Sequence, residues 1–137
     1  MGKKVVFITG GSSGIGKATG IFLKSKGYIV YGTTRSLAKH ADFDAFTLLQ
    51  LNVHDEVSVQ KAISEVIRKE HRLDILINNA GVGITGPIEE TPISEIENAF
   101  DVNFNGPLRM VQAVLPQMRK QRSGFIINIT SIAGYMG

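Results

Sequence analysis

Glycines and small hydroxyl residues follow an unbroken apolar run near the amino terminus. Val5 to Ile8 are β-branched or aromatic and carry no charge, and the glycine-rich segment 10–16 comes directly after them. Glycine accepts positive φ and lets a ligand approach the main chain closely. The helix predicted over about Ile15 to Lys26 begins at this turn and points unpaired N–H groups and its positive end toward it. This arrangement predicts an anion site, suited to a pair of linked phosphates.

The glycine spacing narrows the choice of ligand. The pattern is Gly10-x-x-x-Gly14-x-Gly16, which differs from the commoner dinucleotide pattern Gly-x-Gly-x-x-Gly, and no Lys-Ser or Lys-Thr pair follows, as a P-loop requires. Taken alone, these glycines are also compatible with a tight structural turn. The residues predicted to form the phosphate cradle are Gly10, Ser12, Ser13, Gly14, Ile15 and Gly16.

Further motifs decide between these interpretations. The glycine motif, Thr9-Gly-x-x-x-Gly-x-Gly16, resembles that of the short-chain dehydrogenase/reductase family. Three further motifs match the family in its order: Asn78-Asn79-Ala80-Gly81, Asn103 within Asp101–Gly106, and Asn128-Ile-Thr-Ser-Ile-Ala-Gly134. They cover essentially all 137 residues. The resemblance implies a single NAD(P)-binding Rossmann domain over residues 1–137, and an oxidoreductase that interconverts an alcohol and a carbonyl by hydride transfer.

The residues after the second predicted strand bear on the choice of cofactor. In dinucleotide-binding folds an acidic residue at this place holds the ribose 2′-hydroxyl, whereas a nearby Arg accommodates a 2′-phosphate. The segment 32–36 contains no acid, and Arg35 offers a planar fork of donors, with Thr34 and Ser36 as hydroxyl partners. NADP(H) is therefore favoured over NAD(H). The alternative is that Arg35 is a solvated surface residue.

The resemblance also implies the remaining cofactor contacts. Asn52 and Val53 occupy the place that receives adenine, although an Asp is more usual where this chain has Asn52. The turn at Asn79, Ala80 and Gly81 is similar to the one that lies beside the adenine ribose, and Asn79 is also expected to brace the central sheet.

Two residues match the family's catalytic positions. Ser131 corresponds to the serine that polarises the substrate carbonyl, with Thr130 as its nearest rival. Asn103 corresponds to the helical asparagine whose main-chain carbonyl holds a water of the proton relay. Pro107 lies four residues later and has no N–H to bond that carbonyl, which predicts a kinked helix. A kink that serves packing alone is the alternative.

The family's proton donor, in a Tyr-x-x-x-Lys motif, does not follow Ser131 before Gly137. Tyr135 is no convincing substitute, because it lies close to Ser131 and no Lys comes after it. We therefore expect this chain to be the cofactor-binding portion of a longer enzyme, truncated after the fifth strand and inactive alone. The alternatives are a non-catalytic nucleotide-binding or interaction protein, and a phosphate-binding fold without nicotinamide specificity.

These residues need a scaffold of alternating strands and helices. Strand-like runs occur at Lys4–Thr9, Tyr28–Thr34, Ala45–Leu51, Asp74–Asn78 and Phe125–Thr130, with helical patterns between most of them. This series predicts an α/β fold with a doubly wound parallel sheet of strand order 3-2-1-4-5 and a cleft at the carboxyl ends of the strands. A capping box at Ser94–Glu97 predicts the start of a long helix.

Composition excludes several other classes. The chain has 43% hydrophobic residues and no cysteine, and His40, His54 and His71 lack ligand spacing, so we predict one domain and no metal site. It contains neither a membrane span nor a signal peptide, which favours a cytoplasmic protein. The net charge of the chain is only +3, and its densest basic cluster, residues 119–122, is predicted to lie at the end of a helix, where cations favour the negative pole. No aromatic stacking platform accompanies this cluster, so we do not interpret it as a nucleic-acid site. The resemblance implies an alcohol or carbonyl substrate and a homo-oligomer.

Overall fold

A five-stranded parallel sheet forms the centre of the computed structural model, which describes residues 2–135. The strands are β1 (Val5–Ile8), β2 (Ile29–Thr34), β3 (Thr47–Gln50), β4 (Ile75–Asn78) and β5 (Phe125–Asn128). Each lies within its predicted range. The sheet order β3-β2-β1-β4-β5 confirms the predicted order, with the switch point between β1 and β4. Beyond β4, the edge strand β5 exposes Phe125 by 69%.

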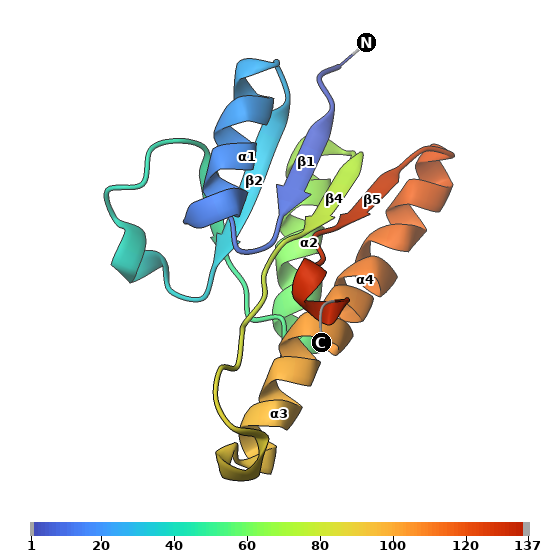
Figure 1. Cartoon of the computed structure of the whole chain (residues 1–137). Helices are drawn as coiled ribbons and strands as arrows, with labels where there is room; N and C mark the ends of the chain where they lie inside the picture. The colour runs from blue at the N-terminus through green and yellow to red at the C-terminus, as the bar shows by residue number, and fades with distance from the viewer. Residues whose placement is uncertain (1, 136–137) are drawn as a thin grey trace.

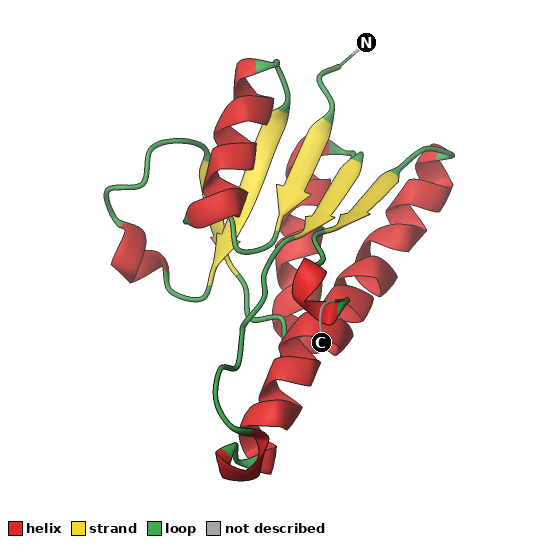
Figure 2. Cartoon of the chain, viewed as in Figure 1, coloured by secondary structure: helices red, strands yellow, loops and turns green. Residues whose placement is uncertain are grey.

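Helices cover both faces of this sheet (Figures 1 and 2). These helices are α1 (Gly14–Ser25), α2 (Glu56–Glu70) and α4 (Gly106–Gln121), whereas α3 (Ile93–Phe100) precedes α4 and lies beyond the sheet. Helix α1 lies on one face, while α2 and α4 pack on the other. Alternate residues of β1 belong to the two cores, since Val5 and Phe7 face α2 and α4 whereas Val6 and Ile8 face α1. The unbroken apolar character of β1 follows from this two-sided burial.

The ring of Phe46 packs α1 closely against β2. A Cβ added at Gly20 of α1 would lie 2.3 Å from this ring, and one at Gly32 of β2 would lie 2.5 Å from it. The ring therefore fills a slot that exists only because both elements lack a side chain there. This contact places the start of α1 beside the ends of β1 and β2.

The predicted long helix is interrupted, and its predicted start is wrong. Helix α3 begins at Ile93 after Pro92, with no side-chain cap, so Ser94 lies inside the helix instead of capping it. A π-helical segment, Asp101–Asn105, then separates α3 from α4. The interruption lies just before Pro107, the residue that lacks an N–H to bond the Asn103 carbonyl. Phe100 and Leu108, on either side of it, are 59% and 47% exposed.

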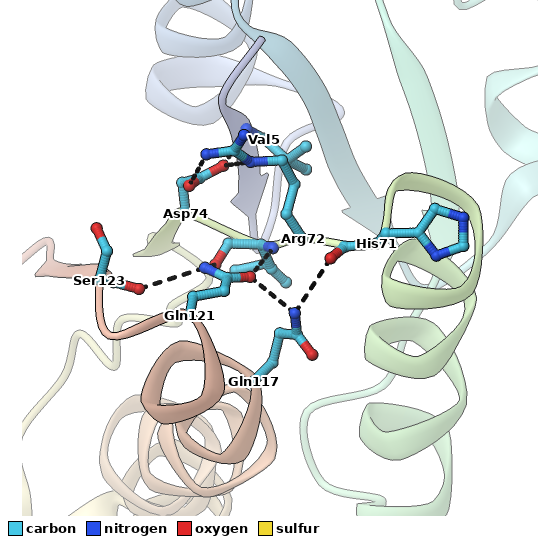
Figure 3. A network of polar contacts seen from close by, with 8 residues as sticks. Val5, His71, Arg72, Asp74, Gln117, Gln121 and Ser123 are labelled. Atoms are coloured by element: carbon cyan, nitrogen blue, oxygen red, sulfur yellow. Dashed lines mark hydrogen bonds and ion pairs between the residues drawn. The ribbon is translucent and has the colours of Figure 1, made fainter. Parts of the chain in front are cut away.

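Polar side chains tie the end of α4 to the start of β4 (Figure 3). The Gln121 amide accepts a hydrogen bond from the Leu73 N–H (2.9 Å) and donates to the Leu73 carbonyl (3.0 Å). Gln117 donates to Gln121 at 2.8 Å. Because both main-chain groups of Leu73 are held, α4 and β4 are fixed relative to each other where the strand begins.

Asp74 joins the same corner to β1. Its carboxylate accepts the Val5 N–H at 2.8 Å and two hydrogen bonds from Arg72 at 2.7 and 2.8 Å. Burial raises the pKa of Asp74, but the bonds from Arg72 and Val5 outweigh it and hold the pKa below its usual value.

Within residues 2–135, no helix is long and apolar enough to cross a membrane.

Candidate functional site

A cavity of about 750 Å³ opens at the carboxyl ends of the strands. Most of its lining residues lie at or shortly after the ends of β1, β2, β3 and β4, which is where ligands bind in open α/β sheets. The predicted cofactor residues that line it are Gly10, Ser12, Ser13, Thr34, Arg35, Ser36, Asn52, Val53, Asn79, Ala80 and Gly81. Gly14, Ile15 and Gly16 are not among the lining residues; Gly14 and Ile15 are exposed and Gly16 is buried.

The turn between β1 and α1 requires its glycines. Gly10 and Gly14 have φ of 67° and 51°, in the left-handed region that disfavours side chains. A Cβ at Gly16 would lie 2.4 Å from the Gly10 carbonyl oxygen, so the turn packs directly on the first turn of α1. At Gly14 no atom lies within 4 Å of an added Cβ, so the outer side of the turn is open space.

The start of α1 carries no cap of its own. Its N-cap residue, Ser13, makes no side-chain cap hydrogen bond, and the first turn holds no acidic residue. Helix α2 differs, because Asp55 accepts the Val57 N–H and Glu56 follows it. The N–H groups and positive end of α1 are thus left for an external anion. The open, uncapped turn fits a pyrophosphate.

Hydrogen bonds between the β1 and β4 loops hold this turn in place. The Thr9 hydroxyl accepts the N–H groups of Asn79 and Ala80, both at 3.0 Å. In return, the Asn79 amide donates to the carbonyls of Thr9 (3.1 Å) and Gly10 (3.2 Å). Asn79 therefore braces the sheet beside the cavity, as expected from the sequence.

Three cationic or ionisable side chains line the cavity at the end of β2. Arg35 is exposed and makes no ion pair within residues 2–135. Lys39 and His40 come from the short 3₁₀ helix Leu37–His40 and were missed by the sequence reasoning. The signal in the sequence that could have pointed to Lys39 was its position only four residues after Arg35. The Thr34 hydroxyl accepts the Ser36 N–H at 3.3 Å, which shapes the turn that carries Arg35.

The loop after β3 forms the next part of the lining. The Asn52 side chain accepts the His54 N–H at 3.2 Å, and the Asn52 main-chain N–H donates to the Ser58 hydroxyl at 3.0 Å. His54 also lines the cavity, and no motif had indicated it. Its Nδ1 lies 2.5 Å from an oxygen of Asp101 in the π-helical segment.

Asp101 is the most heavily bonded carboxylate near the cavity. Arg109 contacts both of its oxygens, at 2.8 and 3.0 Å, and Asn105 donates at 2.9 Å. These bonds, with that of His54, hold the pKa of Asp101 well below its usual range. Asp101 is therefore a fixed negative charge at neutral pH.

The two predicted catalytic residues lie outside the cavity lining. The Asn103 amide bonds both main-chain groups of Val82, at 2.9 and 2.8 Å, and Val82 is a lining residue. Ser131 is exposed, and its hydroxyl accepts the Ala133 N–H at 3.1 Å at the start of a 3₁₀ helix. Tyr135 is 93% exposed.

Comparisons with known proteins agree with this architecture. The family model for short chain dehydrogenases matches residues 4–137. The chain is 43% identical over 137 residues to a 3-ketodihydrosphingosine reductase of Bacteroides thetaiotaomicron, covering 100% of this chain and 50% of that protein. It is 37% identical over 146 residues to Homo sapiens retinol dehydrogenase 8, covering 98% and 46% of the two chains.

A solved structure of ElxO with NADP bound superposes with a TM-score of 0.92 at 33% identity, covering 99% of this chain and 58% of that one. The chain thus spans about half the length of the curated relatives it matches. The match over nearly all its residues shows that the chain belongs to the short-chain dehydrogenase family of oxidoreductases.

Proposed function

We propose that residues 1–137 form an NADP(H)-binding domain, the cofactor-binding portion of an enzyme that interconverts an alcohol and a carbonyl. The uncapped start of α1, facing a cavity that Arg35 also lines, is the observation that carries the proposal. When bound, the nicotinamide cofactor supplies or accepts the hydride. The residues of the protein bind and orient the cofactor and polarise the substrate carbonyl.

The phosphate contacts come from the main chain and from small hydroxyls. The first N–H groups of α1, with Ser12 and Ser13, would hold the pyrophosphate. Gly10, at positive φ, lines the cavity without a side chain, so phosphates can approach the main chain closely there. A helix start with an acidic cap, such as that of α2, would repel them.

The basic side chains after β2, those of Arg35, Lys39 and His40, support NADP(H) over NAD(H) as the cofactor. Arg35 would form a two-pronged contact with the 2′-phosphate, and Lys39 and His40 border the same cavity. No acidic residue lines the cavity to repel that phosphate. The structural similarity to a protein with NADP bound supports this choice.

Ser131 would polarise the substrate carbonyl, and Asn103 would serve the proton relay through its main-chain carbonyl. The names of the similar proteins, a ketosphingoid reductase and a retinol dehydrogenase, favour an apolar alcohol or ketone as substrate. Asn52 and Val53 would border the adenine, and Gly81 the adjoining ribose.

Calorimetric titration with NADPH, NADH and ATP tests the proposal. We expect NADPH to bind most tightly. Arg35→Asp should weaken NADPH binding by about 10- to 100-fold, because it replaces a charge-assisted contact with a repulsive one, and should spare NADH. Arg68→Asp on α2, which makes the same charge change outside the cavity lining, is the matched control. Equal losses for NADPH and NADH would overturn the role of Arg35.

The non-catalytic alternative makes the same binding prediction and differs in turnover. Expression of the whole open reading frame, with NADPH oxidation followed by absorbance over a panel of apolar ketones, separates the two. Turnover supports the oxidoreductase, whereas tight binding without any turnover supports a binding protein. ATP binding as tight as that of NADPH would instead favour a general phosphate-binding fold.

A further inference from the structure

Two loops that border the cavity from different sides attach to one short π-helical segment, Asp101–Asn105. The first, here called the β3 loop, is residues 52–54; the second, the β4 loop, is residues 80–82. His54 of the β3 loop contacts Asp101, and Val82 of the β4 loop contacts Asn103. The segment is therefore the shared support of two walls of the cavity.

Asp101 reaches the β3 loop by two routes. Its carboxylate contacts the His54 ring directly. It also binds Arg109, whose Nη1 donates to Asp101 at 3.0 Å and to the Val53 carbonyl at 3.0 Å. Arg109 thus bridges the carboxylate and the main chain of a cavity residue. A planar guanidinium held on two sides fixes orientation as well as distance.

Close backbone packing supports the same connection. A Cβ added at Gly106 would lie 3.0 Å from the Cβ of Val53, so the β3 loop lies directly against the end of the π-helical segment. The Gly106 N–H donates to the Asp101 carbonyl, five residues back. In this wide turn Asn105 and Arg109 both donate to Asp101, while Asn103 contacts the β4 loop.

We propose that Asp101 is a positioning residue for the adenine half of the cofactor, acting through Arg109 and His54 on the β3 loop. The proposal rests on the proposed NADP(H) binding. It means that Asp101, without lining the cavity itself, sets the distance between the two loops that the adenine end must enter. Because Asn103 is on the same segment, the adenine wall and the proton-relay residue share one support.

Asp101→Asn tests the proposal, because it keeps the shape and removes the charge that holds Arg109. We expect the dissociation constants of NADPH and of adenosine 2′,5′-bisphosphate to rise together by about tenfold. The bisphosphate carries the adenine end and no nicotinamide, so an equal effect locates the loss. Asp55→Asn is the matched control, since Asp55 lies next to the β3 loop and Asn still caps α2.

Hydrogen exchange of the ligand-free protein separates positioning from general stability and does not depend on cofactor binding. In Asp101→Asn, exchange should rise in the β3 and β4 loops and stay unchanged in β1. If that variant fails to fold, Arg109→Lys and His54→Gln replace it, because each breaks one route and leaves Asp101 charged. A chain that binds no NADPH refutes the proposed function, while the exchange data still decide the support role. Unchanged loop exchange, or a loss for NADPH without one for the bisphosphate, overturns the inference.

Discussion

Gly16→Ala is expected to damage the phosphate cradle more than it stabilises α1. One effect favours alanine: its helix propensity exceeds that of glycine by about 1 kcal/mol, a difference that already includes the lower entropy of the unfolded chain. Against this gain stands a steric overlap. The new Cβ would lie 2.4 Å from the Gly10 carbonyl oxygen and 2.6 Å from the Asn79 amide nitrogen.

The overlap decides the sign, because Gly10 contributes a main-chain atom that cannot rotate away. The turn after β1 must move, at an overpacking cost of about 1–3 kcal/mol. The Asn79 amide must move too, and its bonds to the Thr9 and Gly10 carbonyls are worth about 0.5–1.5 kcal/mol each. Set against the gain of about 1 kcal/mol from helix propensity, these costs leave an expected net loss of about 1–5 kcal/mol in the free energy of unfolding.

Urea unfolding followed by circular dichroism measures this loss. Calorimetry measures NADPH affinity, which should fall at least about tenfold because the displaced turn is the proposed source of the phosphate contacts. Gly83→Ala is the matched control, since nothing lies within 4 Å of its added Cβ and its φ is not positive. If Gly16→Ala proved as stable and as tight a binder as Gly83→Ala, the steric reasoning would be refuted.

Two further substitutions test the scaffold. Asp74→Asn should lower the free energy of unfolding by about 1–3 kcal/mol at neutral pH, since it breaks the ion pair with Arg72. Because folding lowers the pKa of Asp74, the wild type should lose this stability as the pH falls below about 4. In urea titrations across pH, the stability of the variant should therefore fall less steeply on the acid side. An equally steep fall would contradict this. Phe46→Ala should cost about 3–5 kcal/mol in the same assay by emptying the slot between α1 and β2, whereas Phe22→Ala, at a ring that is 58% exposed, should change little; similar losses for both would contradict the slot.

Local patterns predicted the elements well where one residue's environment depends on its near neighbours. The uncharged apolar run Val5–Ile8 marked the strand β1, and the glycines that follow it marked the turn before α1. The capping box at Ser94 failed because Pro92, with its restricted φ, starts the helix earlier, and a serine then fits inside it. Pro92 and Ser94 are two possible helix starts only two residues apart, and the sequence pattern alone could not decide between them.

The sequence by itself determined the order of the strands, the family and a glycine turn suited to an anion, because each of these depends on local spacing and on motifs that recur in a known order. Only the tertiary structure decided that Lys39, His40 and His54 border the same cavity as Arg35. It also decided that Asp101 contacts His54, 47 residues away in the chain. No periodicity records such pairs, since they meet only when strand ends from distant segments are brought to one edge of the sheet.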